Sequence, residues 1–91
     1  MVTIHKYRLE IANQQRVTMR KGAKVLCVHN NPSGPCIWAL VDTDEPMEKR
    51  TFFILETGKP CVWNADTYVG TFDMLGGRIV YHVFDLGTLA L

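Results

Sequence analysis

Residues 35–42, with the sequence PCIWALVD, are the stretch that decides the fold. Six consecutive apolar residues run from Cys36 to Val41, and an acidic turn with a proline follows at 42–46. The run is too short for a membrane-spanning helix or an ordinary core helix. A strand that is buried on both faces loses the alternation of polar and apolar residues, because neither face meets water. The stretch therefore predicts a central strand, covered on both sides, with Trp38 in the core.

Segments on both sides of this stretch predict further strands. Each combines β-favouring residues with a period of two, and turn-forming residues separate one from the next. These segments are residues 5–11, 16–20, 23–29, 49–56, 68–74 and 78–86. With the 35–42 strand they make seven short strands at intervals of about ten residues, without an amphipathic helix. The pattern predicts an all-β fold: a small antiparallel β-sandwich or barrel of about seven strands with little or no helix.

Turn residues predict how the first four strands pair. We expect 5–11 and 16–20 to form one hairpin, because only a short turn-like break separates them. The more apolar 23–29 segment is expected to be a central strand. It forms a second hairpin with the 35–42 strand across a loop rich in Asn, Pro and Gly.

Glycines make two further local predictions near the C-terminal end. Gly76 and Gly77 predict a tight two-residue hairpin turn between the last two strands. Gly70, inside a strand, predicts a bulge or a close approach of the backbone to a neighbour. Residues 61–66 have no clear period and predict a loop with at most one helical turn.

Length and composition are those of one ordinary globular domain. The chain has 91 residues, 47% of them apolar and 21% charged, with a formal net charge of +1. That is enough for a single core and typical of a soluble protein, so we expect one β domain over residues 1–91. No apolar run is long enough to span a membrane, and the first ten residues alternate, unlike a signal peptide. The sequence therefore predicts a cytoplasmic protein without a membrane segment.

Residue types that carry chemistry do not gather into a catalytic or metal-binding pattern. The chain has three cysteines without a CxxC spacing, which argues against a disulfide framework or a zinc knuckle, and each lies among apolar residues. Cys27 and His29 share one strand face, but the sequence nominates no third ligand. Ser33, the only serine, lies in a Pro/Gly turn and not in a nucleophile elbow. We expect no catalytic residue, no metal site, no cofactor, and a protein that is not an enzyme.

Charge is unevenly distributed along the chain. Residues 1–30 contain six Lys and Arg against one acidic residue, a net of +5, and residues 31–91 contain four against eight, a net of −4. This asymmetry has two interpretations: an anion-binding face, or oppositely charged strands that pair across a sheet.

The candidate binding residues follow from the first interpretation, with one loop tryptophan added. They are Arg16, Arg20, Lys21, Lys24, Arg78 and Trp63. Such cations favour a phosphate-bearing ligand. The loop position of Trp63 predicts either a hot spot for a partner or packing over an open barrel end.

Short motifs extend over nearly the whole chain. They are K-Y-x-L-x-I at 6–11, G-A-K at 22–24, P-C-I-W-A-L-V-D at 35–42, T-G-x-P at 57–60, G-T-F at 70–72 and H-V-F at 82–84. In these motifs the chain resembles a family of short proteins of unknown function from bacteriophages and prophage-bearing bacteria, and C-[IL]-W-A-L-V-D is the most specific of them. Arg20 and Lys59 depart from that family, which carries proline and often histidine at these positions.

The resemblance implies a small phage-type accessory protein in the cytoplasm of the bacterial host. By analogy it implies a non-enzymatic binding protein that inhibits a host or defence-system protein, in an anti-CRISPR-like or similar anti-defence role. Two alternatives stay open: an oligomeric sponge that sequesters a signalling nucleotide, and a minor virion or assembly component. The expected partner is a bacterial protein and not a membrane. The apolar tail residues Leu86, Leu89 and Leu91 predict either a homodimer contact or a plug for one barrel end.

Overall fold

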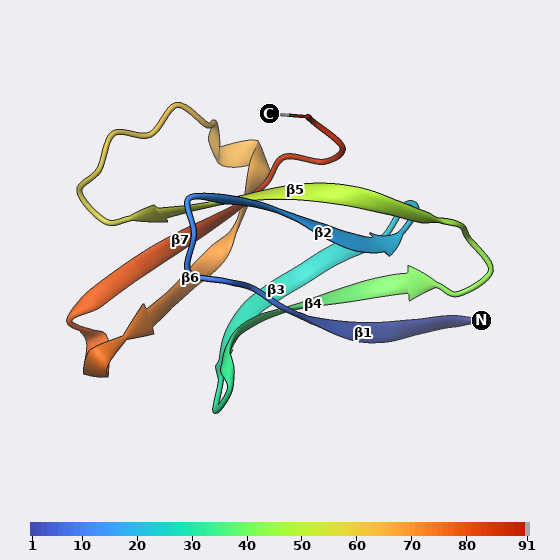
Figure 1. The fold of residues 1–91 in the computed structure, drawn as a ribbon, viewed down its shortest axis with the longest axis horizontal. Helices are drawn as coiled ribbons and strands as arrows, with labels where there is room; N and C mark the ends of the chain where they lie inside the picture. The colour runs from blue at the N-terminus through green and yellow to red at the C-terminus, as the bar shows by residue number, and fades with distance from the viewer. Residues whose placement is uncertain (91) are drawn as a thin grey trace.

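The computed structural model describes residues 1–90 and shows seven strands in two antiparallel sheets (Figure 1). One sheet has the strand order β1-β4-β3 and the other the order β2-β5-β7-β6. The predicted all-β antiparallel fold is confirmed, and the two sheets make it a sandwich. Its elements are β1 (Val2–Arg8), β2 (Gln14–Arg20), β3 (Lys24–Asn31), β4 (Gly34–Asp42), β5 (Met47–Glu56), η1 (Ala65–Thr67), β6 (Tyr68–Met74), η2 (Leu75–Gly77) and β7 (Ile79–Asp85), where η marks a single 3-10 turn.

The chain passes from one sheet to the other after β1, after β2 and after β4. β1 therefore pairs along its whole length with β4, and β2 pairs with β5. The predicted hairpin of 5–11 with 16–20 is wrong, whereas the β3–β4 hairpin is confirmed. A strand with one apolar face fits either sheet, so its local pattern fixes which side is buried but not which strand is its neighbour.

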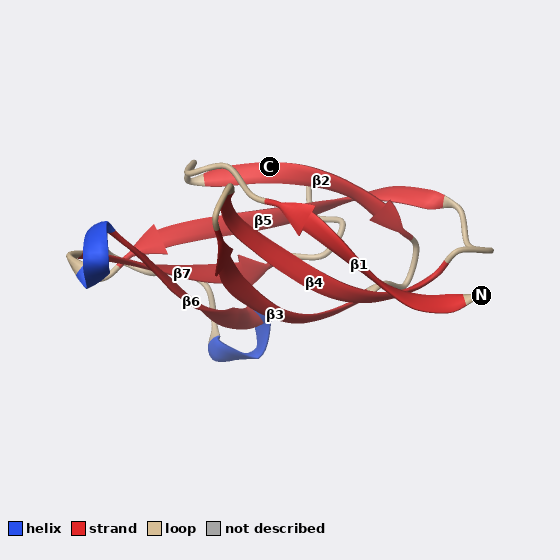
Figure 2. Cartoon of the chain, turned by 90° about the horizontal axis from the view of Figure 1, so that it is seen from below, coloured by secondary structure: helices blue, strands red, loops and turns tan. Residues whose placement is uncertain are grey.

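β4 is the middle strand of the three-stranded sheet, and its side chains alternate between two environments. Ile37, Ala39 and Val41 point inward and are buried, whereas Trp38 is half-buried and Leu40 is exposed on the other side. Figure 2 views the molecule from below, with β1, β4 and β3 side by side toward the viewer. The expected burial on both faces is wrong, because the sandwich supplies a second layer on one side of β4 only.

β3 is an edge strand and not the central strand that its apolar sequence predicted. It pairs with β4 alone within its sheet. Val28 is its buried side chain, while Leu26 and Cys27 are exposed. The apolar composition of β3 therefore reflects exposed apolar positions and not a second neighbouring strand.

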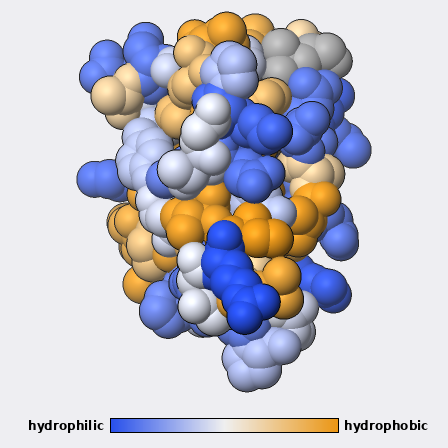
Figure 3. Space-filling model, turned by 90° about the vertical axis from the view of Figure 1, so that its left-hand side faces the viewer, coloured by the Kyte–Doolittle hydropathy of each residue, from blue (hydrophilic) through white to orange (hydrophobic). Residues whose placement is uncertain are grey.

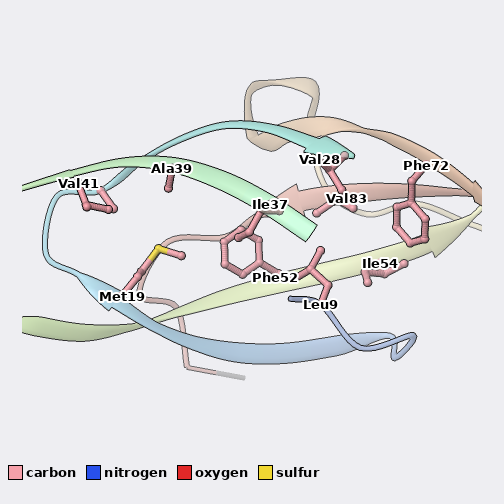
Figure 4. Packing of buried hydrophobic residues seen from close by; sticks show 11 residues of the cluster. Leu9, Met19, Val28, Ile37, Ala39, Val41, Phe52, Ile54, Phe72 and Val83 are labelled. Atoms are coloured by element: carbon pink, nitrogen blue, oxygen red, sulfur yellow. The ribbon is translucent and has the colours of Figure 1, made fainter. Parts of the chain in front are cut away.

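The core lies between the two sheets, and both sheets contribute to it (Figure 4). Removal of this apolar surface from water is the main stabilising term, at about 25 cal/mol per Å². The buried cluster consists of Leu9, Met19, Ala23, Val28, Ile37, Ala39, Val41, Phe52, Ile54, Phe72 and Val83.

The turn between β6 and β7 is longer than predicted. The last pair of the ladder is Met74↔Ile79, so residues 75–78 form the connection and not the two glycines alone. Leu75 adopts a φ of 53°, and both glycines also have positive φ. A Gly-Gly pair thus marked the position of the turn but not its length.

β6 passes close to β3 where the two sheets approach each other. A register shift separates Tyr68 from Gly70, and a Cβ at position 70 would lie 3.0 Å from Cγ1 of Val28. The side-chain amide of Asn30 donates to the Asp73 carbonyl at 2.8 Å. Both alternatives predicted for Gly70, a bulge and a close backbone approach, are confirmed.

Gly70→Ala should lower the free energy of unfolding by about 1–2 kcal/mol, because the new methyl group presses on Val28. Urea unfolding measures the loss. Val28→Ala removes Cγ1, the atom that the new methyl group would contact. The Gly70→Ala change should therefore cost at least about 0.5 kcal/mol less in a Val28→Ala background than in the wild type. Equal losses in the two backgrounds would contradict the close approach.

An ion pair with little exposure joins three parts of the sandwich. Arg50 of β5 donates to Oδ2 of Asp85 at 2.6 Å and to the Ala23 carbonyl at 2.8 Å. The other Asp85 oxygen accepts from the Gly87 N–H at 2.9 Å. The Arg50 and Asp85 side chains are 11% and 18% exposed. The pair holds β5, the end of β7 and the turn before β3 together.

Arg50→Met should lower the free energy of unfolding by about 2–4 kcal/mol, because it leaves the Asp85 carboxylate poorly solvated and without its cation. Chemical denaturation at neutral pH measures this. The double variant Arg50→Met/Asp85→Asn should recover part of the loss, since it removes the Asp85 charge together with its cation and leaves only the more exposed Glu48, 3.9 Å from Arg50 in the wild type, without a partner. A single variant as stable as the wild type would show that the ion pair does not stabilise the fold.

Candidate functional site

The face of the three-stranded sheet that points away from the core carries exposed apolar side chains. The register places Ile4 of β1 beside Leu40 of β4, with Lys24 of β3 on the other side of Leu40. This surface is turned toward the viewer in Figure 2. We call it the outer face; it consists of Val2, Ile4, Lys6, Arg8, Lys24, Leu26, Cys27, His29, Trp38 and Leu40.

Four apolar side chains of the outer face are strongly exposed. The exposed fraction is 63% for Val2, 54% for Ile4, 45% for Leu26 and 39% for Leu40. Single exposed apolar residues are ordinary on protein surfaces. A contiguous group of them across three neighbouring strands is typical of an interaction surface.

Trp38 lies at the centre of the outer face. Its strand neighbours on the two sides are Lys6 and Cys27, and the Nζ of Lys6 lies 5.8 Å from the centroid of the indole ring. This is a cation–π contact that covers part of the ring. The prediction that Trp38 belongs to the core is wrong, because its position in β4 alternates with the buried Ile37 and Ala39.

Cations surround the apolar centre of the outer face. Lys6 and Arg8 come from β1 along one edge, and Lys24 comes from β3 along the other. Of the residues that the sequence nominated for binding, Lys24 is the one that belongs to this face. The sequence missed the apolar members, because an apolar run in a strand is the same pattern whether a partner or the protein's own core covers it.

One acidic residue, Asp42, lies at the end of the outer face. Its Oδ1 accepts from the Asp44 N–H at 3.0 Å and lies 3.4 Å from the Met1 ammonium. The hydrogen bond from Asp44, together with the N-terminal charge, holds the pKa of Asp42 below its ordinary value of 3.8. Its charge is therefore satisfied within the chain.

Asp42 should make the free energy of unfolding fall as the pH drops below about 4. Its pKa is lowered in the folded state, so the unfolded chain binds the proton more readily. The stability that Asp42 contributes is present above its unfolded pKa and is lost as the pH falls through its folded pKa. Urea unfolding at a series of pH values measures the slope. Asp42→Asn should make the slope shallower, and an unchanged slope would show that Asp42 does not contribute to it.

Two of the nominated cations lie against the acidic turn. Arg20 donates to the Glu45 carbonyl at 2.9 Å, and the Lys21 N–H donates to the Pro46 carbonyl at 2.7 Å. Burial raises the pKa of Tyr7, and the nearby Arg20 charge partly opposes that shift. The basic segment thus lies beside the acidic one, but through backbone carbonyls, and the β2–β5 register places neither Arg16 nor Arg20 opposite an acidic residue.

The nominated arginines, Arg16, Arg20 and Arg78, do not converge on one point. Arg20 lies where β5 begins and Arg78 lies beyond the end of β5, so about 30 Å of this ten-residue strand separates them. Arg16 precedes Val17, which packs against the core, and therefore points away from it. A phosphate-binding cluster of these residues is not formed.

Trp63 lies in the connection between β5 and η1, which passes over the far side of the four-stranded sheet (Figure 1). Its indole packs edge-on against Phe53 of β5, with 5.6 Å between ring centroids. Its Nε1 is buried and has no hydrogen-bond partner within residues 1–90. Of the two alternatives for this tryptophan, packing against its own domain describes the geometry better.

The C-terminal tail is held against β5 by Thr51, a buried residue. The Thr51 N–H donates to the Gly87 carbonyl at 2.7 Å, its carbonyl accepts from the Leu86 N–H at 2.8 Å, and its hydroxyl donates to the Leu89 carbonyl. Leu91, the last residue of the predicted tail contact, lies outside the described residues. These bonds favour the plug alternative over a homodimer contact.

A cluster of hydroxyl groups around His82 was not predicted. The Thr57 hydroxyl donates to the Val80 carbonyl at 3.1 Å, and its oxygen lies 2.6 Å from Nε2 of His82; the tautomer compatible with the first bond has Nε2 as the donor in the second. Nδ1 of His82 then accepts from the Tyr68 hydroxyl at 2.9 Å, with the Thr71 hydroxyl also in reach.

The hydrogen bonds of this cluster are satisfied internally. A nucleophile–base site needs a hydroxyl free to lose its proton to the base and a third group that orients the imidazole. Here the Thr57 proton is directed to a backbone carbonyl. The cluster therefore links β5, β7 and β6 and does not form a triad. Its members lie in the turn after β5, in β7 and in β6, so no sequence spacing could reveal it.

The cysteines differ from their prediction in part. Cys36 is buried, whereas Cys27 and Cys61 are exposed, because β3 is an edge strand and position 61 lies in a surface connection. Cys27 and His29 do share the outer face. Within residues 1–90, no group of three His, Cys, Asp or Glu side chains is arranged to hold a metal ion.

Comparison with known proteins identifies a family model. The model, described as "Domain of unknown function (DUF7352)", matches residues 1–89. No curated protein and no solved structure matches the chain. Among the residues that the structure describes, no helix is both long and apolar enough to cross a membrane.

Proposed function

The chain belongs to this family of unknown function, and we propose that it is a non-enzymatic binding protein whose outer face docks a partner protein. The observation that carries the proposal is the exposure of Leu40 in β4, beside Trp38, which its own chain covers only in part. The sequence of β4 is that of a strand covered on both sides, yet within residues 1–90 the outer side is covered at Cys36, half covered at Trp38 and exposed at Leu40. An apolar surface on a partner would supply the missing layer.

The rim of the outer face indicates the chemistry of that partner. Lys6, Arg8 and Lys24 surround the apolar centre, so an apolar surface bordered by acidic residues complements it. A second copy of the chain is a poorer match, because face-to-face packing would bring three such cations from each copy together. The Asp42 carboxylate that could offset them is engaged by the N-terminal ammonium.

On this proposal the partner is a bacterial host protein, such as a component of a defence system, and docking inhibits it in the host cytoplasm. The support is the resemblance to short phage and prophage proteins, together with the exposed apolar side chains and the cations of the outer face. A domain of this kind acts in a one-to-one ratio, by occupying a surface that its target needs.

Leu40→Glu should abolish docking while the protein stays folded, because Leu40 already points to solvent and a carboxylate there repels an acidic partner. We expect at least about a 30-fold loss of affinity, which corresponds to a hot-spot energy of about 2 kcal/mol. The matched control is Val62→Glu, since Val62 is 83% exposed in the β5–η1 connection, away from this face. Trp38→Ala should weaken binding in the same way.

The measurement compares three immobilised proteins in lysates of candidate hosts: wild type, Leu40→Glu and Val62→Glu. A protein retained by wild type and Val62→Glu but not by Leu40→Glu is then purified and titrated by calorimetry, and its activity is assayed with and without the ligand. Equal retention by Leu40→Glu, or no retained protein that depends on Leu40, would refute the proposal. So would sedimentation data that show a dimer closed over this face.

The nucleotide-sponge alternative receives less support from the geometry. It needs several cations around one phosphate, whereas Arg20 and Arg78 are at opposite ends of the four-stranded sheet. A thermal-shift screen with cyclic and linear nucleotides distinguishes the two functions. Stabilisation that depends on Arg20 would favour the sponge.

A further inference from the structure

A cleft lies at the end of the sandwich shown on the left of Figure 1, where β5 runs beyond the start of β2. Its volume is about 450 Å³, within the range of small-ligand and short-peptide sites. Figure 3 views this end of the molecule and shows a band of apolar atoms between hydrophilic ones. The residues that carry the argument are Ile11, Phe53, Leu55, Glu56, Lys59 and Tyr81.

The cleft exists because β5 loses its neighbour on one side before it ends. The last β2–β5 pair is Gln14↔Phe53, and the chain before Gln14 departs toward the other sheet. β5 continues for three more residues, to Glu56, with β7 along its other side. Since the Ile54 N–H still bonds the Asn13 carbonyl, the open edge runs from the Ile54 carbonyl to the Glu56 N–H, a length of about 7 Å.

Backbone groups on that open edge point into the cleft. The Ile54 N–H donates to the Asn13 carbonyl on the β2 side at 2.8 Å, and the Thr57 N–H donates to the Val80 carbonyl on the β7 side at 2.9 Å. Successive N–H groups of a strand point to opposite sides, so the N–H of Glu56 points to the β2 side. The Ile54 carbonyl points the same way, and no loop backbone or side chain of residues 1–90 bonds either group.

This pair of groups matches one residue of a parallel strand. In a parallel ladder, a residue donates its N–H to one carbonyl of its neighbour and accepts from the N–H two positions further on. The Ile54 carbonyl and the Glu56 N–H have that spacing. A peptide in this register runs in the direction of β5 and leads toward Lys59.

The aromatic walls of the cleft suit apolar side chains, and each packs against a second aromatic ring. Phe53 is backed by Trp63, and Tyr81 stacks on Phe72 with ring centroids 5.3 Å apart. Such fixed aromatic walls bind with little loss of side-chain entropy.

We infer that this cleft binds the C-terminal end of an extended segment of a partner protein, parallel to β5, with its free carboxylate beside the Lys59 ammonium. The nearby Glu56 carboxylate disfavours acidic side chains, so the segment is apolar and its terminal carboxylate is its one negative group. This site lies apart from the outer face and does not depend on the function proposed for that face.

The test uses the full chain and two probes, N-acetyl-Ala-Val-Leu with a free carboxylate and the same peptide as its amide. Titration followed by amide chemical shifts should move the signals of Glu56 and Lys59, and the carboxylate form should bind roughly tenfold more tightly than the amide form. Lys59→Gln should remove that difference. Leu40→Glu should leave it unchanged, which separates this site from the outer face.

Substitutions at Glu56 test the backbone contact itself. Glu56→Pro removes the cleft-facing N–H, while the Glu56 carbonyl can still accept from the Lys59 N–H, and proline is tolerated at such an edge. It should abolish binding of the carboxylate peptide, and the control Glu56→Ala should retain it. If Glu56→Pro does not fold, the inference is tested by the tighter binding of the carboxylate peptide than of the amide peptide, and by the loss of that difference in Lys59→Gln. Equal binding of both peptides, shifts confined to the outer face, or no shift at peptide concentrations up to about 10 mM would overturn the inference.

Discussion

Alternation along β4 is the constraint on which the rest of the molecule depends. Successive side chains of a strand point to opposite faces, so an unbroken apolar run is divided equally between the two sides of a sheet. In β4 one half, with Ile37 and Val41, closes the core against the four-stranded sheet. The other half, with Trp38 and Leu40, is left on the outer face because residues 1–90 place no third layer over it. The same sequence feature thus produces both the stability of the fold and its most prominent surface.

The sequence predicted the secondary structure of each segment more successfully than its neighbouring strands in the sheets. The positions of the later strands, the β3–β4 hairpin and the role of Gly70 follow from local pattern and were confirmed, whereas the first strand runs from Val2 to Arg8 and not over the predicted 5–11. The pairing of β1 with β4, in place of a hairpin with β2, depends on contacts between distant segments that a local period does not encode. For the same reason the candidate site was largely missed. Lys24 was found by its charge, but Leu40 was assigned to the core, since composition does not reveal a missing layer.

The basic residues 1–30 and the acidic residues 31–91 are separate in the sequence but adjacent in the folded structure. The basic N-terminal part and the acidic turn meet at one end of the sandwich, where the Met1 ammonium faces Asp42 and Arg20 lies against the Glu45 carbonyl. Arg50 and Asp85 complete this arrangement inside the structure. Lys6, Arg8 and Lys24 on the rim of the outer face form no ion pair within residues 1–90, and on our proposal they give that face its preference for an acidic partner.

The long-range pairing of β1 also has a consequence for synthesis of the chain. Val2 pairs with Asp42, so β1 leaves the ribosome without a partner strand, and residues forty positions later must follow before it has one. Closure of such a loop is slow compared with hairpin formation. In the newborn chain, the apolar residues Val2 and Ile4 are therefore open to chaperones before the sheet that carries them can form.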